Sequence, residues 1–367
     1  MEKSYNTITK FTKEILSYEI GMEKPKVAIL GAIFTGFDGV SRVIEQQAKE
    51  LSMMCDVSIY ALEADMAPPK NVKLEIIGSP KNMYLNRIYR LFLPLNLIVM
   101  IKYIKLLGNY DLIIAHHYPL SLLAYFTKSL YDVKYVQWHH SISTDGYTKF
   151  HHKIYMWFIE YFEEKSFIIK GADHICSISE FSRELLERKG GIDSIAVYNS
   201  VGGRFKEGLN GSKIRLKFEV EGKPLILFVG RIHPQKNVHT LIEVFKIVEG
   251  QIPDTKLMIV GKSIFDEYFE QIQVMSNESV IFAGYIPHEE LPYYYAACDV
   301  YATCSLSESF NLPVVEAQRC GTPVVAFDIG SHREVVENGV LVKEEAVEEF
   351  AREIVNMIKR SEDENSR

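Results

Sequence analysis

The sequence lacks paired cysteines, long apolar runs and a signal-peptide core. Its five cysteines are scattered over 367 residues without a C-x-x-C pair, at Cys55, Cys176, Cys298, Cys304 and Cys320. This usage argues against disulfides or a zinc module and indicates a reducing compartment. No stretch reaches the roughly eighteen uninterrupted apolar residues of a spanning helix, and residues 1–24 are mixed polar and charged. We therefore expect a cytoplasmic protein, at most peripheral on the inner face of a membrane.

An excess of positive charge is also missing. The formal net charge is −7 at pH 7, which opposes binding to the phosphate backbone of nucleic acids. Hydrophobic residues make up 47% of the chain and charged residues 24%, ordinary proportions for a globular protein. The length is sufficient for two domains with separate cores. We therefore expect a globular protein with no nucleic acid partner.

Apolar runs typical of buried strands alternate with helical patterns along the whole chain. This order predicts an α/β fold with parallel sheets. Residues 201–222, richer in glycine and charge, separate two groups of strands and are interpreted as a hinge. We predict two Rossmann-like domains facing each other across a cleft, at 1–203 and 223–342, with a C-terminal helix within 343–367. The candidate strands are 26–31, 57–60, 112–115, 135–138, 174–177, 195–198, 225–229, 256–260, 279–283, 299–303 and 323–327.

Two glutamates flank the start of a predicted helix in the second half. Glu308 lies in a loop that follows an apolar strand, Pro313 favours the first helical turn, and Glu316 falls about one turn into the helix. Between the glutamates lie the backbone N–H groups of a helix N-terminus, which attract anions. Carboxylates on both sides of a phosphate site suit a nucleotide sugar, with its sugar, diphosphate and ribose in that order.

A second loop fits the same ligand. The apolar run at 224–229 stops at Gly230 and Arg231, and Lys236 follows before the next helix. Open α/β sheets bind ligands at the carboxyl ends of their strands. Fixed cations there would neutralise a leaving diphosphate. The alternative is that Arg231 and Lys236 are solvated loop charges.

Together, these segments resemble the retaining glycosyltransferases of family four, which have the two-domain GT-B fold. The likeness is stronger over 224–340 than over 26–203, and the two glutamates are separated by seven residues, as in the family. The residues that carry it are Gly230-Arg231, Lys236-Asn237, Glu308, Phe310, Leu312-Pro313, Glu316, Gly321 to Val325, and Ser177 to Ser182.

The resemblance implies a hexosyltransferase that uses a nucleoside diphosphate sugar, with UDP-sugars favoured, and needs no further cofactor. Glu308 would hold the donor sugar and Glu316 the ribose. Arg231, Lys236 and backbone amides near Phe310, Asn311 and Leu312 would stabilise the leaving diphosphate. The Asp-x-Asp metal site of a different glycosyltransferase fold is missing, so we expect no required metal. Asn311 stands where the family usually has glycine, and its bulk or its amide could alter the sugar pocket.

The resemblance also predicts contacts from the first domain. A glycine-rich turn at 35–39 would approach the diphosphate or the sugar through Gly39, although Asp38 replaces the first glycine of the usual pair. The alternative is a tight strand-to-helix turn. His139, at the end of the strand over 135–138, would contact a sugar hydroxyl, and a one-residue slip to His140 is left open. The last helix of the family often packs back onto the first domain, so we expect the same of 343–367.

Residues 81–107 suggest where an acceptor is found. This segment contains Lys81, Arg87, Arg90, Lys102 and Lys105, no acidic residue, and many large apolar side chains. The mixture suits the surface of an anionic membrane, and predicts a glycan acceptor that is lipid-linked or membrane-associated. The alternative is a pair of core helices broken at Pro94 with solvated basic edges.

Other functions on the same fold stay possible from the sequence. A non-catalytic or regulatory subunit could bind a nucleotide sugar without transferring it. A sugar-nucleotide epimerase or a phosphorylase could share the nucleotide site. The intact set of Arg231, Lys236, Glu308 and Glu316 favours the transferase.

Overall fold

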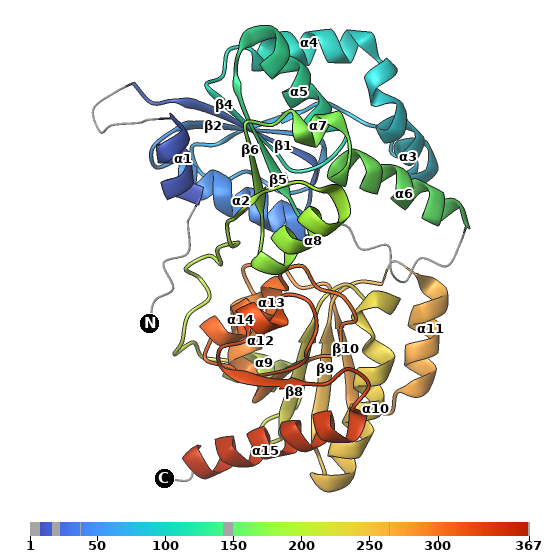
Figure 1. Cartoon of the computed structure of the whole chain (residues 1–367). Coiled ribbons are helices and arrows are strands. Elements are labelled where there is room, and N and C mark those ends of the chain that lie inside the picture. The colour runs from blue at the N-terminus through green and yellow to red at the C-terminus, as the bar shows by residue number, and fades with distance from the viewer. Residues whose placement is uncertain (1–7, 17–22, 37, 142–149, 264, 366–367) are drawn as a thin grey trace. The chain divides into compact units, whose positions relative to one another are not determined.

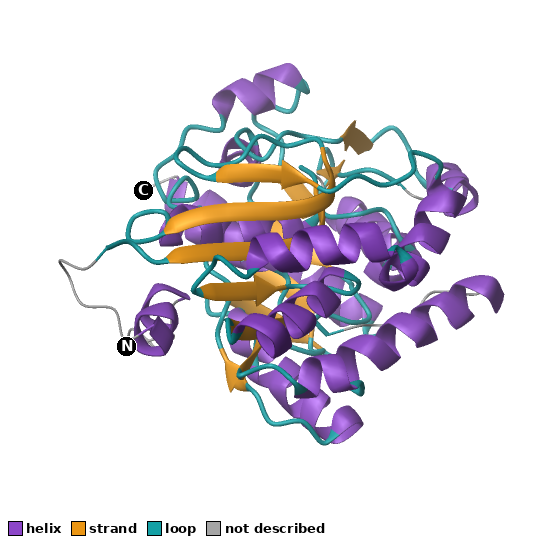
Figure 2. Ribbon diagram, turned by 90° about the horizontal axis from the view of Figure 1, so that it is seen from above, coloured by secondary structure: helices purple, strands orange, loops and turns teal. Residues whose placement is uncertain are grey.

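A computed structural model describes residues 8–16, 23–36, 38–141, 150–263 and 265–365. The chain divides into two compact units, Met1–Ser200 and Val201–Arg367, each built on one parallel sheet with helices packed against its strands (Figures 1 and 2). The predicted α/β class with two parallel-sheet domains is therefore confirmed. Within the described ranges, no helix is long and apolar enough to cross a bilayer.

The first unit contains a seven-stranded sheet in the order β3-β2-β1-β4-β5-β6-β7. The chain moves outward from β1 in one direction and then restarts beside it with β4, which makes the carboxyl ends of these two strands a switch point. The strands are β1 Lys26–Phe34, β2 Asp56–Ala64, β3 Lys73–Ile76, β4 Leu112–Ala115, β5 Lys134–His139, β6 His174–Ser177 and β7 Ile195–Ala196. The helices are α1 Ile8–Leu16, α2 Gly39–Leu51, α3 Met83–Phe92, the 3₁₀ turn η1 Leu93–Leu95, α4 Leu97–Leu107, α5 Leu120–Tyr131, α6 Phe150–Glu164, α7 Phe167–Lys170 and α8 Glu180–Gly190.

The second unit contains a six-stranded sheet in the order β10-β9-β8-β11-β12-β13. Here the direction reverses between β8 and β11, so the loops that follow these two strands leave the sheet side by side. The strands are β8 Leu225–Val229, β9 Lys256–Val260, β10 Val280–Gly284, β11 Val300–Thr303, β12 Val324–Phe327 and β13 Gly339–Val342. The helices are α9 Ser212–Lys217, the 3₁₀ turn η2 Pro234–Lys236, α10 Val238–Gln251, α11 Asp266–Met275, α12 Leu291–Ala297, α13 Leu312–Arg319, α14 His332–Val335 and α15 Val347–Asn365.

The strands form where continuous apolar runs can be buried on both faces. All five residues of β8 are buried, as are all four of β11 and of β12. By contrast, the edge strand β3 is largely exposed, and the edge strand β13 is fully buried only at Val342. Neither strand was predicted: β3 alternates charged and apolar residues, and β13 is an apolar run of only three residues after Gly339.

The C-terminal helix α15 uses its apolar face within the second unit. Phe350, Ile354 and Ile358 are buried in the same core cluster as residues of α10, β11 and β12. The helix lies within the predicted range 343–367, and its apolar face is buried in the second unit. The expected packing of this helix onto the first domain stays a prediction. Figure 1 shows α15 running along the second unit beside α10.

Part of the segment interpreted as a hinge also belongs to the second unit. Helix α9 lies within 201–222 and buries Ile214. A side chain at Gly211 would meet the backbone of Ala297 in α12 at 2.4 Å, so the two segments touch through their main chains. The hinge interpretation was therefore too long at its C-terminal end.

Candidate functional site

The predicted donor residues of the second unit lie on the two loops of its switch point. The loop after β8 carries Arg231 and Lys236, and the loop after β11 carries Glu308. Two hydrogen bonds join the loops: the Leu306 N–H donates to the Gln235 carbonyl at 2.9 Å, and the Gln235 side-chain amide donates to the Ser307 carbonyl at 3.2 Å. The loops therefore form one surface at the carboxyl edge of the sheet.

Lys236 and Glu308 form an ion pair on this surface. The distance from Lys236 Nζ to Glu308 Oε1 is 2.6 Å, and the side chains are 19% and 8% exposed. Burial alone would raise the pKa of Glu308, but the Lys236 ammonium and the hydrogen bonds from Lys236 and Ser305 bring that pKa below its ordinary value. Glu308 is therefore a carboxylate at neutral pH, able to accept hydrogen bonds from hydroxyl groups.

The backbone of the loop after β12 holds Glu308 in place. The Ser331 N–H donates to the Glu308 carbonyl at 3.1 Å. Gly330 has a φ of +49°, and a Cβ at this position would lie 2.2 Å from that same carbonyl oxygen. Glycine is therefore required at 330 for the loop to approach Glu308 so closely.

Asn311 is held by His332, a histidine that was not predicted as a site residue. The buried His332 donates from Nδ1 to the Phe327 carbonyl at 2.7 Å, so its Nε2 accepts a hydrogen bond from the Asn311 amide at 2.8 Å. Burial lowers the pKa of His332, which keeps the ring neutral in this tautomer. Asn311 also has φ 61°, the left-handed conformation in which asparagine is tolerated and glycine is common. The available signal for His332 was its place in the segment that follows a buried strand, five positions after Phe327.

Glu316 is buried on the helix that starts beside this loop. Pro313 occupies the first turn of α13, as predicted, and no described side chain caps that turn. The Tyr295 hydroxyl donates to Glu316 Oε2 at 2.7 Å, and His288 Nε2 lies 3.4 Å from Oε1. Both partners come from the segment before β11, and neither was predicted.

Arg231 differs from Lys236 in being exposed. No ion pair joins its guanidinium to a described residue. Its neighbour Gly230 is approached by Gly261, where a Cβ would lie 1.8 Å from the Gly230 carbonyl oxygen. Phe310 is buried, and Leu312 is the half-buried first residue of α13. The structure thus brings Lys236 to Glu308 and leaves Arg231 free for a ligand, while the ligand contacts of all these residues stay predictions.

The glycine-rich turn of the first unit has a different construction from the one expected. Asp38 caps α2: its Oδ2 accepts a hydrogen bond from the Ser41 N–H at 2.9 Å. This explains an acidic residue in place of the usual glycine. A Cβ at Gly39 would meet no atom within 4 Å, and its backbone is not left-handed. Neither packing nor conformation requires glycine there, which leaves close approach of a ligand as the predicted reason. Phe37 lies outside the described residues.

His139 is completely buried in the first unit. Its Nε2 lies 3.6 Å from the buried carboxylate of Glu164 in α6, which also lies 3.4 Å from Lys189. His140 instead joins His116, with 2.8 Å between His140 Nε2 and His116 Nδ1. In the structure, His139 is thus a buried neighbour of the Glu164 carboxylate. The contact with a sugar hydroxyl stays a prediction, for His139 and for the alternative at His140.

His116 and His140 form a buried chain of neutral rings. His116 Nε2 donates to the side-chain oxygen Oε1 of Gln47 at 3.0 Å. Burial lowers the pKa of both histidines well below the ordinary value, so the second nitrogen of His116 accepts from His140.

Next to them, His117 Nδ1 lies 3.0 Å from Glu163. Burial would lower the pKa of His117, but this carboxylate raises it.

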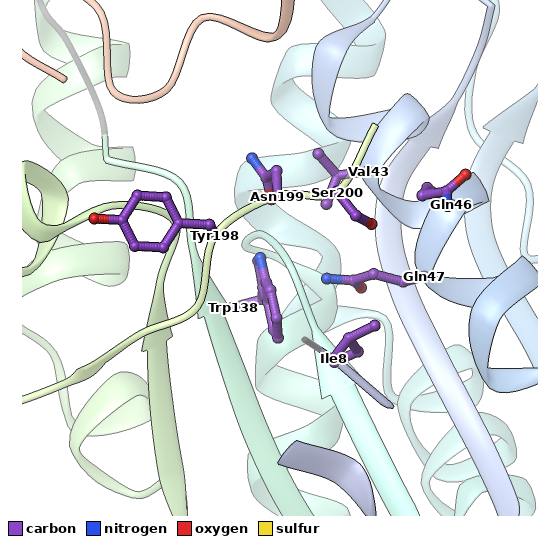
Figure 3. Close-up of a pocket in the computed structure, with 8 residues that line it drawn as sticks. All are labelled: Ile8, Val43, Gln46, Gln47, Trp138, Tyr198, Asn199 and Ser200. Carbon is purple, nitrogen blue, oxygen red and sulfur yellow. The ribbon is translucent and has the colours of Figure 1, made fainter. Parts of the chain in front are cut away.

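A small cavity in the first unit is lined in part by Gln47. Its volume is about 10 Å³, room for about one water molecule and far too little for a nucleotide sugar. Figure 3 shows Gln47 from α2 and Trp138 from β5 beside Asn199. This cavity is not the donor site. Over the described part of the chain, no cluster of three or more histidine, cysteine or acidic residues is arranged to hold a metal.

Sequence models of two protein families match separate parts of the chain. The model described as Glycosyltransferase Family 4 matches residues 37–201. The model described as Glycosyl transferases group 1 matches residues 212–367. Together they cover most of the sequence, one for each structural unit.

Curated relatives match shorter segments. An uncharacterised 41.2 kDa protein in the cps region of Klebsiella pneumoniae is 37% identical over 145 residues, 39% of each chain. The Escherichia coli O-antigen chain mannosyltransferase B is 29% identical over 130 residues, 34% of each chain. A GDP-mannose-dependent phosphatidylinositol monomannoside mannosyltransferase of Mycolicibacterium smegmatis is 32% identical over 140 residues, 35% of this chain and 36% of its own. Each match thus spans well under half of the relative's length.

Solved structures match over nearly the whole chain. The Anabaena protein HepE, solved in complex with UDP and glucose, has a TM-score of 0.71 at 21% identity, over 92% of this chain and 91% of its own. WaaG, a glycosyltransferase involved in lipopolysaccharide biosynthesis, has a TM-score of 0.70 at 15% identity, over 92% and 91%. At these identities the likeness shows the fold.

Proposed function

Because this chain belongs to the family-four, group 1 glycosyltransferases and has their GT-B fold, we propose that it transfers a hexose from a nucleoside diphosphate sugar to a glycan acceptor, with retention of configuration. The observation that carries this proposal is the Lys236–Glu308 ion pair at the switch point of the second sheet. A buried carboxylate there can hold sugar hydroxyl groups, and cations beside it favour a diphosphate.

Three kinds of protein group would contact the donor: carboxylates, cationic side chains and a glycine backbone. Glu308 accepts hydrogen bonds from hydroxyl groups of the donor sugar. Glu316, already oriented by Tyr295, accepts from the ribose. Arg231 and Lys236 face the diphosphate, since Arg231 has no ion-pair partner in the described ranges and Lys236 is 19% exposed. Gly39 in the first unit approaches the ligand through its backbone.

The reaction would begin with cleavage of the bond between the anomeric carbon and the phosphate oxygen. The electron pair goes to the phosphate, and positive charge develops on the sugar ring as in an oxocarbenium ion. The acceptor oxygen then bonds to the anomeric carbon on the same face, and its proton goes to the departing phosphate. Glu308 is paired with Lys236 and serves to position the sugar in this scheme; it is not the nucleophile. Arg231 and Lys236 stabilise the leaving charge without a metal.

UDP-sugars are the favoured donors. HepE was solved with UDP and glucose, which supports this choice, whereas the mycobacterial relative is named as GDP-mannose-dependent. The base is therefore left to experiment. For the acceptor we propose a lipid-linked or membrane-associated glycan, because the Escherichia coli relative is named for the O-antigen chain and the first unit carries an apolar, basic surface.

The first test is thermal stabilisation of the purified protein by UDP, GDP and ADP and by their hexose conjugates, in buffer containing EDTA. One nucleotide should raise the melting temperature, and Glu316→Ala should abolish the shift. The matched control is Glu270→Ala, which removes an exposed glutamate from α11 and should respond like the parent protein.

Turnover separates the transferase from a non-catalytic binding subunit. With the donor so identified, release of the nucleoside diphosphate should depend on Glu308 and Lys236, and NMR of the glycosylated product should show the anomeric configuration of the donor. Nucleotide binding without turnover on any acceptor preparation would favour the binding subunit. Inversion would contradict the front-face mechanism, and loss of activity in EDTA would contradict metal independence.

A further inference from the structure

The outer surface of α3, η1 and α4 in the first unit exposes large apolar side chains. Six of them define this outer surface and are between 54% and 83% exposed: Leu85, Ile88, Phe92, Leu95, Ile98 and Ile101. We propose that the outer surface docks onto an anionic lipid bilayer. Figure 1 shows α3 and α4 at the periphery of the first unit, with α4 against α5.

The helical spacing shows that these residues are not needed for the fold. In α4, Met100, Tyr103 and Leu107 are buried in the core of the first unit. Ile98 and Ile101 lie on the other side of the same helix and are 83% and 66% exposed. A helix that is apolar on both sides has one side that the unit itself does not cover. A contiguous apolar surface of this kind marks a contact with a partner or a membrane.

The charges beside the outer surface favour an anionic partner. Between residues 81 and 107 there are five basic and no acidic side chains. Arg90 is neutralised by Glu63 at 2.7 Å, whereas the exposed Lys102 and Lys105 of α4 have no acidic partner in the described ranges. Exposed lysines next to inserted apolar side chains are the pattern of a surface that binds anionic lipids. A second copy of the chain would bring equal charges together, so the bilayer is the better occupant.

The outer surface begins at the carboxyl edge of the first sheet. Asn86 of α3 donates to the Glu63 carboxylate at the end of β2 and to the Pro80 carbonyl. The Tyr118 hydroxyl, just after β4, donates to the Leu91 carbonyl at 2.7 Å. Docking would therefore place this carboxyl edge near the lipid headgroups. That this edge receives a lipid-linked acceptor rests on the proposed function; the docking itself does not.

The experiment is flotation of the full chain with vesicles at physiological salt. Vesicles of phosphatidylcholine mixed with phosphatidylglycerol are compared with vesicles of phosphatidylcholine alone. The test variant is Ile98→Asp, and the matched control is Val274→Asp, which places the same residue at an 87% exposed apolar position on α11 of the second unit. A double variant, Lys102→Glu with Lys105→Glu, tests the charges.

The parent protein and Val274→Asp should float with the anionic vesicles and much less with the neutral ones. Loss of one inserted side chain should reduce partitioning of Ile98→Asp by about tenfold or more. The lysine double variant should also weaken vesicle binding, and this effect should be larger at low salt than at high salt. Failure of the parent protein to bind anionic vesicles, or equal binding of Ile98→Asp, would overturn the proposal. A dimer in light scattering that Ile98→Asp dissociates would assign the surface to a second copy instead.

Nucleotide stabilisation, measured on the same samples without vesicles, separates the two proposals. A normal nucleotide response without flotation overturns the docking surface and leaves the donor site standing. Flotation without any nucleotide response overturns the proposed function and leaves the docking surface standing.

Discussion

Replacing Lys236 by methionine should leave the Glu308 carboxylate buried without its cation. Methionine keeps the length and apolar stem of lysine but cannot neutralise the carboxylate, whose Oε1 lies 2.6 Å from Lys236 Nζ. Breaking a fully buried ion pair from one side costs about 3–5 kcal/mol. We expect the free energy of unfolding to fall by about 3 kcal/mol, at the lower end of this range, because the Lys236 side chain is 19% exposed.

This loss should be visible as a lower melting temperature. For a unit of this size, about 3 kcal/mol corresponds to roughly 6–12 °C. The double variant Lys236→Met with Glu308→Gln removes the charge that was left unpaired, so most of the stability should return. Transfer activity should be lost in both variants, since neither retains the cation. Differential scanning calorimetry and nucleotide release measure the two effects separately.

The pH dependence has a definite sign. In the parent protein the pKa of Glu308 is below its ordinary value of 4.5. The ion pair therefore stabilises the folded protein fully at pH values above 4.5, and this contribution is lost as the pH falls through the lower folded-state pKa. In Lys236→Met, burial would raise the pKa of Glu308, and protonation relieves the unpaired charge. The difference in melting temperature should therefore be largest near neutral pH and shrink in acid. An equal difference at all pH values, or no rescue by Glu308→Gln, would refute the reasoning.

Three further outcomes are expected. Gly39→Ala should weaken donor binding without lowering the melting temperature, because the added methyl meets no atom within 4 Å; unchanged nucleotide affinity in calorimetric titration would count against the close approach. Gly330→Ala should destabilise the second unit by about 2 kcal/mol or more, since its Cβ would lie 2.2 Å from the Glu308 carbonyl oxygen, and a parent-like melting temperature would disprove this. Glu163→Gln should lower the pKa of His117, measured by NMR titration of the ring, because the Glu163 carboxylate raises this pKa. The attraction between His117 and Glu163 stabilises the folded protein fully below the ordinary histidine pKa of 6.5. This contribution is lost as the pH rises through the folded-state pKa of His117. No change in the titration would disprove the pairing.

The sequence alone identified the central strands and the loops that carry the candidate site. The run at 225–229 is apolar throughout and ends at glycine, and the structure has a strand with the same bounds. Such a run can only be buried, and glycine or proline ends it, so both signals are local. The same reasoning placed Arg231, Lys236 and Glu308 at carboxyl ends of strands, and Glu316 on the following helix. The edge strands β3 and β13 were not predicted, because β3 has no continuous apolar run and the run in β13 is only three residues long.

Only the tertiary structure decided which of these residues meet. Lys236 and Glu308 are 72 positions apart, and their contact depends on β8 and β11 being neighbours in the sheet. His332, which holds Asn311, and Gly330, which allows the approach to Glu308, come from a third loop after β12. The partner of α15 was likewise set by the apolar faces available around the second sheet. Local patterns specify elements and their ends, whereas pairings over long sequence separations depend on strand order and close packing, which no single segment contains.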